Sequence, residues 1–294
     1  MNGLLRGALY LSAASSIWGG MYVVSKYTLD TIPPFTLLFF RYLIASLVLG
    51  FLCWKSKVGL VPREHKKWVF QIGFVGYFLS IAAQFIGTKY SSAHMGAVIT
   101  TLSPVFLSAF AIFLLHEKIT RKQVISIAVA FAGVLVVVGI PGSQGEGGSL
   151  VGSLFLMAAA LFWGYYSVIS RKISSFYSPL QITTWGIVLA TGLTFPCIFF
   201  EWGNWAPQVL TRMPIILSIL YIGIISTAVA FFSWNKGLAL LPAHQAGVFF
   251  FFQPVVGTLL GWFFLNEQLH ISFIMGSLLI ILGVYFNMKQ TSAG

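Results

Sequence analysis

Ten apolar runs, each about 20 residues long, set the strongest limit on what this 294-residue chain can fold into. A helix needs about 20 consecutive apolar residues to cross the hydrocarbon core of a bilayer, so runs of this length predict transmembrane helices. They are too long and too uniformly apolar for the alternating strands of a membrane β-barrel. The runs lie at residues 7–29, 35–54, 68–88, 92–115, 121–140, 150–171, 178–199, 213–235, 243–264 and 270–287.

Composition points to lipid as the main partner of the chain. Only 8% of the residues are charged, against about 25% in soluble domains, and little chain remains between the runs for a soluble domain. The net charge of +11 comes from short basic clusters between apolar runs, as in cytoplasmic loops, which argues against nucleic-acid binding. No nucleotide-binding loop, HExxH or GxSxG motif occurs. We therefore expect no enzyme activity, no cofactor and no metal.

Two blocks of the second half repeat residues of the first half in the same order. A shift of 145 residues superimposes Trp18, Gly19, Ser25, Lys26 and Pro34 on Trp163, Gly164, Ser170, Arg171 and Pro179. A shift of 150 superimposes Ala93, His94, Val98, Pro104, Phe113, Leu115, Glu117 and Gly133 on Ala243, His244, Val248, Pro254, Phe263, Leu265, Glu267 and Gly283. These matches indicate a duplication, with residues 1–141 as the first repeat, 150–289 as the second and 142–149 as the joining loop.

The number of runs in each repeat predicts opposite orientations for the two repeats. Each repeat holds five runs, and this odd number makes the second repeat enter the membrane from the other side. With the N-terminus inside, 13 of the 17 basic residues fall on the cytoplasmic side, three on the outer side (Lys26, Lys89 and Arg212) and Arg41 within a run. We therefore expect an all-α integral protein of the cytoplasmic (inner) membrane, with ten transmembrane helices as two inverted five-helix repeats, both termini in the cytoplasm and the joining loop outside.

Several short stretches, some of which recur at the same spacing in both halves, form a recognisable pattern. They are Trp18–Lys26, Phe40–Ala45, Ser103–Val105 with Glu117, Gln253–Val255 with Glu267, and the late glycines Gly133 and Gly283. These stretches resemble the EamA family of the drug/metabolite transporter superfamily. The resemblance implies a ten-helix carrier with a central substrate cavity between its halves, alternating access, and export of small metabolites or drugs. Family members commonly have Gly before the repeated Glu, where this chain has His116 and Asn266.

Two prolines at matching depths predict where the substrate binds. Pro104 and Pro254 lack the amide that would bond to the carbonyl four residues earlier, so those carbonyls need other partners. We expect the polar groups around the helix breaks to line a cavity at the midplane; the alternative is a packing kink satisfied by neighbouring helices. The candidate cavity residues, chosen as polar or aromatic side chains within the runs, are Trp18, Tyr22, Gln84, Thr101, Ser103, Trp163, Tyr166, Trp234, Asn235, Phe249 and Gln253.

Charged residues supply further candidates, each with an alternative. Arg41 is a candidate contact for an anion, although it could equally extend to the surface or bond to carbonyls. Ion pairs of Lys26 with Glu267 and of Arg171 with Glu117 are candidate gates that would close the two mouths in turn. The alternative for Lys26 is a local pair with an acidic residue one turn away.

These observations favour a secondary transporter that moves small amphiphilic metabolites such as amino acids, and the resemblance implies that it exports them. The alternatives are a multidrug or cationic-compound exporter of the same fold, a channel, and an intramembrane enzyme that would use His94 and His244. Every acidic residue lies in a loop or at the end of a run, so proton coupling would require His, Tyr, a terminal Glu or the substrate. The expected partners are a small-molecule substrate and the bilayer, with the chain a monomer or homodimer.

Overall fold

The computed structural model describes residues 3–59, 64–91, 93–138, 150–265 and 271–291, and every regular element in these ranges is helical. The joining loop predicted at 142–149 and the gate candidate Glu267 lie outside them. The elements of the first half are α1 (Gly3–Leu29), α2 (Pro34–Lys55), α3 (Lys66–Gln71), η1 (Ile72–Leu79), α4 (Ser80–Tyr90), α5 (Ala93–Thr100), α6 (Ser103–Leu115) and α7 (Arg121–Val138). Those of the second half are α8 (Leu150–Ile173), α9 (Pro179–Thr194), α10 (Cys197–Glu201), η2 (Pro207–Thr211), α11 (Met213–Leu220), η3 (Tyr221–Val229), α12 (Ala230–Leu240), α13 (Ala243–Gly247), η4 (Val248–Phe251), α14 (Phe252–Leu265) and α15 (Ile271–Thr291).

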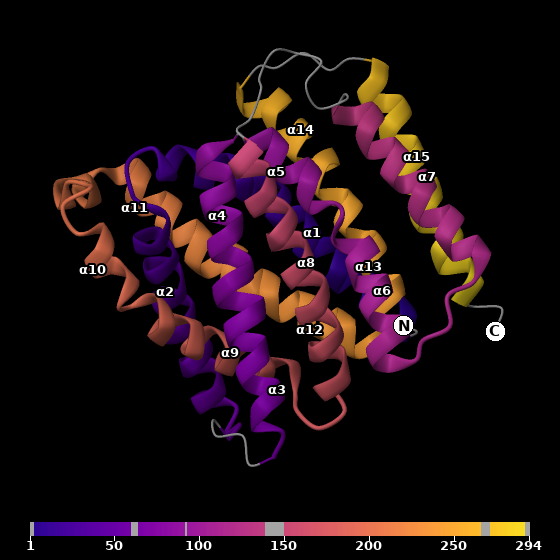
Figure 1. Cartoon of the computed structure of the whole chain (residues 1–294), viewed down its shortest axis with the longest axis horizontal. Coiled ribbons are helices and arrows are strands. Elements are labelled where there is room, and N and C mark those ends of the chain that lie inside the picture. The colour runs from indigo at the N-terminus through magenta and orange to yellow at the C-terminus, as the bar shows by residue number, and fades with distance from the viewer. Residues whose placement is uncertain (1–2, 60–63, 92, 139–149, 266–270, 292–294) are drawn as a thin grey trace.

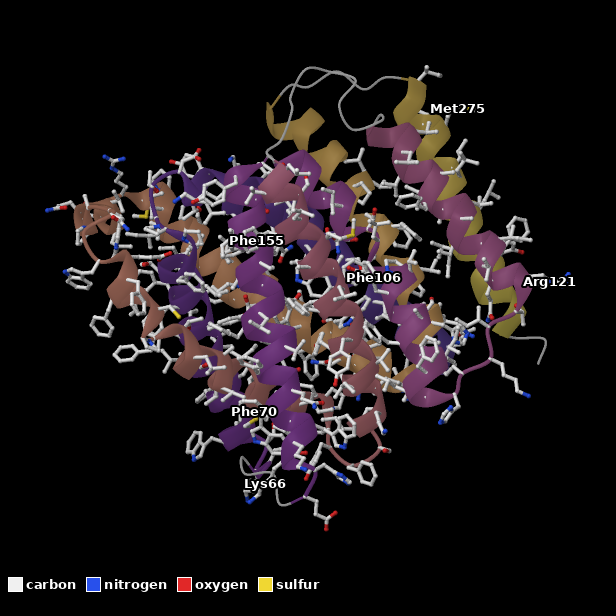
Figure 2. The ribbon with its side chains drawn as sticks, viewed as in Figure 1. Lys66, Phe70, Phe106, Arg121, Phe155 and Met275 are labelled. Carbon is white, nitrogen blue, oxygen red and sulfur yellow. The ribbon has the colours of Figure 1, made fainter. Side chains whose placement is uncertain are left out.

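Four of the described helices are long and apolar enough to cross a membrane by length and composition. They are Pro34–Lys55, Lys66–Tyr90, Leu150–Ile173 and Met213–Leu240. Large apolar side chains are exposed on the outside of the bundle, among them Phe70 and Met275, which project outward in Figure 2. A soluble protein rarely exposes so much apolar surface, whereas lipid-facing helices require it. The described helices therefore form a multi-pass membrane protein.

The helices that contain a π-helical segment occupy equivalent places in the two halves. The segment η1 interrupts the helix Lys66–Tyr90, and η3 interrupts the helix Met213–Leu240 at nearly the same position after the 150-residue shift. A π-helical turn adds a residue to the helical repeat and so rotates everything that follows it about the helix axis. The apolar runs of the sequence do not reveal this rotation.

The prolines coincide with interruptions of the predicted runs. Residues 101 and 102 form a turn between α5 and α6, just before Pro104, so the run at 92–115 is two helices rather than one. The 3₁₀ segment η4 directly precedes α14, which contains Pro254. The run at 178–199 also ends early, because α9 stops at Thr194 before Pro196, which has no amide to donate to the helix.

Equivalent helices of the two halves make equivalent contacts. The helix α1 packs against α12 and α14, and its repeat partner α8 packs against α4 and α6. Figure 1 shows α7 and α15 side by side at one edge of the molecule, with α2, α10 and α11 toward the opposite edge. The central helices between these edges hold the cavity described next.

Two glycines from the repeated motif allow close approaches of this kind. A Cβ atom on Gly19 would lie 3.0 Å from Cβ of Val256 on α14, and one on Gly164 would lie 2.9 Å from Cβ of Phe106 on α6. Val256 and Phe106 are themselves related by the 150-residue shift, so the same contact is built twice. Any larger side chain at either glycine would force the two helices apart.

Candidate functional site

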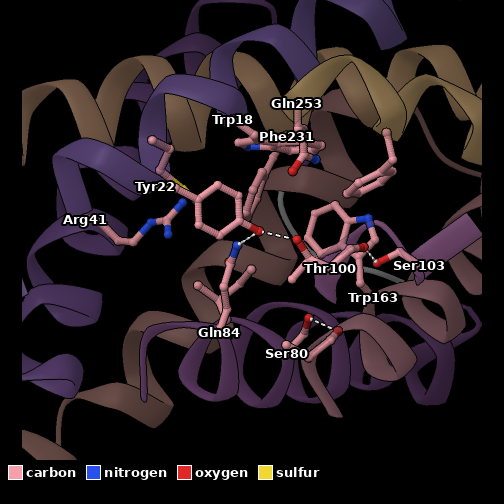
Figure 3. Close-up of a pocket in the computed structure, with 14 residues that line it drawn as sticks. Trp18, Tyr22, Arg41, Ser80, Gln84, Thr100, Ser103, Trp163, Phe231 and Gln253 are labelled. Carbon is pink, nitrogen blue, oxygen red and sulfur yellow. Dashed lines mark hydrogen bonds between the residues drawn. The ribbon is translucent and has the colours of Figure 1, made fainter. Parts of the chain in front are cut away.

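A cavity of about 30 Å³ lies among the central helices (Figure 3). This volume has room for about two water molecules. It is far smaller than the several hundred Å³ of a typical ligand pocket. Seven of its lining residues are candidates from the sequence: Trp18, Tyr22, Arg41, Gln84, Ser103, Trp163 and Gln253. The other seven are Met21, Ser80, Ile81, Thr100, Ala159, Phe231 and Phe250. Both halves contribute, so the site is shared between the repeats.

Hydrogen bonds order the polar side of the cavity. Gln84 Nε2 donates to the Tyr22 hydroxyl over 2.6 Å, and the Tyr22 hydroxyl lies 2.5 Å from Thr100 Oγ1. Because Thr100 Oγ1 itself donates to the carbonyl of Gly96 at 2.7 Å, the proton between the two hydroxyls belongs to Tyr22. The chain therefore runs in one direction, from the Gln84 amide through Tyr22 and Thr100 to a backbone carbonyl, as the dashed lines of Figure 3 show in part.

The helix break at Pro104 satisfies its freed carbonyl within its own segment and also lines the cavity. The Thr100 carbonyl, which Pro104 cannot engage, accepts a hydrogen bond from Ser103 Oγ at 2.7 Å. The kink is thus satisfied within its own segment. Thr100 and Ser103 nevertheless line the cavity, together with Gln253 from the corresponding break in the second half. Gln253 Oε1 is buried and has no hydrogen-bond partner in the described part of the chain.

An aromatic cluster forms the apolar side of the cavity. The rings of Trp18 and Trp163, equivalent residues of the two repeats, meet edge to face with centroids 5.1 Å apart. Phe231 and Phe250 lie within 6 Å of both indoles. The indole nitrogen of Trp18 donates to the Ser226 carbonyl at 3.0 Å, whereas that of Trp163 is buried and finds no partner within the residues that the structure describes. One half thus leaves a donor free beside the cavity.

Five sequence candidates do not line this cavity. Tyr166 and Asn235 belong to a separate buried network, in which Asn235 accepts from Tyr166 and Ser170 and donates to Tyr77 and Thr183 over 2.5–2.9 Å. Trp234 donates to Ser167 Oγ at 3.2 Å. Phe249 and Thr101 are buried outside the lining as well. In this structure the polar groups of Tyr166, Trp234 and Asn235 are satisfied by neighbouring helices, and a contact of these five residues with substrate stays a prediction.

Four further residues line the cavity although the sequence did not mark them as candidates, and they differ in whether the sequence could have done so. Ser80 is a polar residue inside an apolar run, and its hydroxyl donates to the Ala159 carbonyl at 2.9 Å. It could have been found by the criterion that selected Gln84. Phe231, Phe250 and Met21 offer no such signal, because apolar residues occupy every face of these runs.

Of the two candidate gate ion pairs, Arg171 with Glu117 is not formed among the described residues. Lys26 Nζ instead contacts the carbonyls of Thr88, Lys89 and Ser91 at 3.1–3.3 Å, at the end of α4. Arg171 Nη1 donates to the Ala239 carbonyl at 3.1 Å, at the end of α12. Both cations therefore neutralise the exposed carbonyls of a helix C-terminus, a stabilising position for positive charge. Among the described residues Lys26 forms no local pair with an acid either, and its candidate partner Glu267 lies outside them.

Glu117 has a different partner from the one predicted. Its carboxylate lies 2.6 Å from His244 Nδ1 and accepts from the amides of Ala243 and His244 at the start of α13. His244 Nε2 lies 2.9 Å from Gln123 Nε2, which can only donate, so Nε2 is the acceptor there and the proton that faces Glu117 is on Nδ1. Burial alone would raise the pKa of Glu117, but the bonds from His244 and from the two amides lower it overall.

The comparisons with known proteins agree with this architecture. The model of the EamA-like transporter family matches residues 5–139 and again residues 150–289. The chain is 29% identical over 283 residues to "Uncharacterized transporter YetK" of Bacillus subtilis, covering 94% of this chain and 84% of that protein. It is 25% identical over 291 residues to an "Uncharacterized transporter" of Archaeoglobus fulgidus, covering 96% and 98%.

One solved crystal structure has the same fold, with a TM-score of 0.81 over 98% of each chain at 20% identity. The relatives are named as transporters, and the family model recognises each half of the chain separately. This repeated match agrees with the duplicated motifs and with the equivalent helix contacts. The chain therefore belongs to the EamA-like transporter family.

Proposed function

We propose that this protein is a secondary transporter that exports small amphiphilic metabolites by alternating access. The observation that carries the proposal is the position of the cavity, which equivalent residues of the two repeats, Trp18 and Trp163, enclose together. Two similar units that share one central site can exchange conformations of nearly equal energy, as alternating access requires.

The proposed topology has ten transmembrane helices in two inverted repeats, with both termini in the cytoplasm. The equivalent contacts of α1 and α8 and the paired π-helical segments support the duplication. The basic clusters support the orientation. The substitution Ser143→Cys, made in a chain whose Cys53 and Cys197 are replaced by serine, tests this orientation. A membrane-impermeant maleimide should label the new cysteine in intact cells. Labelling only after lysis would mean that the orientation is the opposite one.

The size of the cavity supports a moving carrier over a channel. About 30 Å³ cannot hold a metabolite, so the helices around Trp18 and Trp163 must separate to admit one. The intramembrane-enzyme alternative loses its candidate His244, which is held by Glu117 and Gln123 and does not line the cavity. The side chain of its second candidate, His94, lies outside the described residues.

Counterflow in proteoliposomes tests the transport function. A panel of amino acids, purines, sugars and cationic dyes is offered outside vesicles loaded with the same unlabelled compound, with and without an imposed pH gradient for proton coupling. One class should accumulate transiently, as exchange through a carrier produces. Flux that is not stimulated by internal substrate would favour a channel, and a chemically altered product would favour an enzyme.

Variants locate the site within the same assay. Trp18→Ala, Trp163→Ala and Gln253→Ala remove cavity walls and should lower counterflow while membrane insertion is unchanged. The matched control is Trp54→Ala, because Trp54 is 75% exposed on the outside of α2. Full activity of all three cavity variants would place the substrate elsewhere.

A further inference from the structure

Arg41 is a charged side chain enclosed within the cavity. It lies on α2, has no exposed surface, and lines the cavity beside Tyr22 and Phe231. Figure 3 shows its guanidinium pointing toward the Tyr22 side of the cavity. Its Nε donates to Thr227 Oγ1 at 2.8 Å, while Nη1 and Nη2 have no hydrogen-bond partner among the described residues. These two terminal nitrogens of the guanidinium are therefore available to bind a ligand.

The surroundings of Arg41 do not compensate its charge. Its guanidinium carbon lies 5.1–5.6 Å from the ring centroids of Tyr42, Phe85 and Phe231, close enough for cation–π attraction. Within the described residues the one ion pair is Glu117–His244, so no carboxylate there neutralises Arg41. A guanidinium remains charged in proteins, and an uncompensated charge in the membrane interior is costly. A bound anion would therefore stabilise the charge of Arg41.

The fold itself does not require a charge at this place. The 145-residue shift relates Arg41 to Gly186, and the 150-residue shift relates its partner Thr227 to Tyr77. A Cβ atom on Gly186 would lie 2.1 Å from Cε2 of Tyr77, so in the second half the tyrosine ring fills the same contact. The equivalent helix pair thus packs tightly with no cation. Of the two equivalent positions, only that of the first half carries an arginine, and this is the position that lines the cavity.

We infer that Arg41 binds the substrate anion and that the substrate is an organic carboxylate whose apolar body packs against Trp18 and Trp163. The inference rests on the proposed transport function, whose substrate class it names. Two free terminal nitrogens match the two oxygens of a carboxylate, the geometry in which arginine binds anions most strongly. The free Trp163 Nε1 and Gln253 Oε1 supply one donor and one acceptor for a further polar group of the substrate.

A set of four matched compounds tests this assignment on the purified full-length protein. Phenylalanine, 3-phenylpropanoate, phenylalaninamide and 3-phenylpropanamide share one skeleton and differ only in carboxylate and ammonium groups. A second set on the leucine skeleton repeats the design with a smaller body. Thermal unfolding is followed against the concentration of each compound at ionic strength matched with sodium chloride. The proteins are the parent chain, Arg41→Met, Arg41→Lys, and Arg121→Met, which removes an exposed charge.

The carboxylates should bind the parent chain at least about tenfold more tightly than the amides, the range expected for hydrogen bonds to a charged group. Arg41→Met should abolish this difference, Arg41→Lys should retain part of it, and Arg121→Met should retain all of it. The comparison is made within each variant, so a change in stability does not affect it. Equal shifts by carboxylates and amides, a preference that survives in Arg41→Met, or stabilisation by inorganic phosphate alone would overturn the assignment.

Proteoliposome transport separates this inference from the proposed function. Counterflow of a carboxylate by the parent chain that is lost in Arg41→Met supports both. A carboxylate that binds through Arg41 but is never carried would refute the transport function and leave the anion site standing. Counterflow of a cationic dye at equal rates in the parent chain and Arg41→Met would support the transporter and refute the anion site.

Discussion

The contact between Glu117 and His244 provides the sharpest test of the described geometry. Glu117 joins the loop after α6 to the start of α13 by three hydrogen bonds, at 2.6 Å to His244 Nδ1 and at 3.1 and 3.2 Å to the amides of Ala243 and His244. We predict that Glu117→Gln, which keeps the size and removes the charge, destabilises the protein.

The magnitude follows from the bonds that are lost. A hydrogen bond to a charged acceptor contributes about 1.5–3 kcal/mol, and a neutral one about 1 kcal/mol. The amide oxygen of the glutamine can keep part of the helix cap, so the net loss should be about 2 kcal/mol. For a chain of this size that corresponds to a fall in Tm of about 5 °C.

Thermal unfolding in detergent measures the effect, with two controls. Glu64→Gln makes the same charge change on an exposed residue and should leave Tm within about 1 °C. A double-mutant cycle with His244→Asn should return a coupling energy of about 1–2 kcal/mol. If Glu117→Gln costs no more than Glu64→Gln, or if the two single costs simply add, the described pairing is wrong.

The effect should also depend on pH with a definite sign. The folded state lowers the pKa of Glu117, so the ionised form is the one that folding favours. Its contribution is complete above the pKa of a carboxyl in the unfolded chain, about 4.3, and is lost as pH falls through the lower folded value. The Tm difference between the parent chain and Glu117→Gln should therefore be constant near neutrality and shrink in acid. A difference that grows as pH falls would contradict the direction of the shift.

Two other substitutions test the packing. Tyr22→Phe removes the hydroxyl that accepts from Gln84 and donates to Thr100. The two buried partners then lose a hydrogen bond, which should lower the free energy of unfolding by about 1–3 kcal/mol and slow counterflow. An unchanged Tm would refute the hydrogen-bonded chain. Gly133→Ala should cost about 1–3 kcal/mol, because its Cβ would lie 2.7 Å from a backbone oxygen of α15. Gly50→Ala is its control, since a Cβ there meets nothing within 4 Å and should be neutral or stabilising by up to about 1 kcal/mol.

The sequence alone determined the membrane environment, the duplication and several members of the site. Lipid imposes an apolar run of about 20 residues on any helix that crosses it, so the run pattern can be recognised whatever the tertiary structure. The repeated residues Trp18 and Trp163 were candidates because the duplication set them apart, and the structure brings their rings together at 5.1 Å.

The tertiary structure alone decided which polar groups face the cavity. Gln84 follows the π-helical segment η1 and lines the cavity, where it donates to Tyr22, whereas Asn235 follows η3 and bonds to Tyr166 and its neighbours away from the cavity. The physical reason is twofold. A run that is apolar all round does not mark its inward face, and a π-helical turn rotates the residues beyond it by an amount that the sequence pattern does not contain.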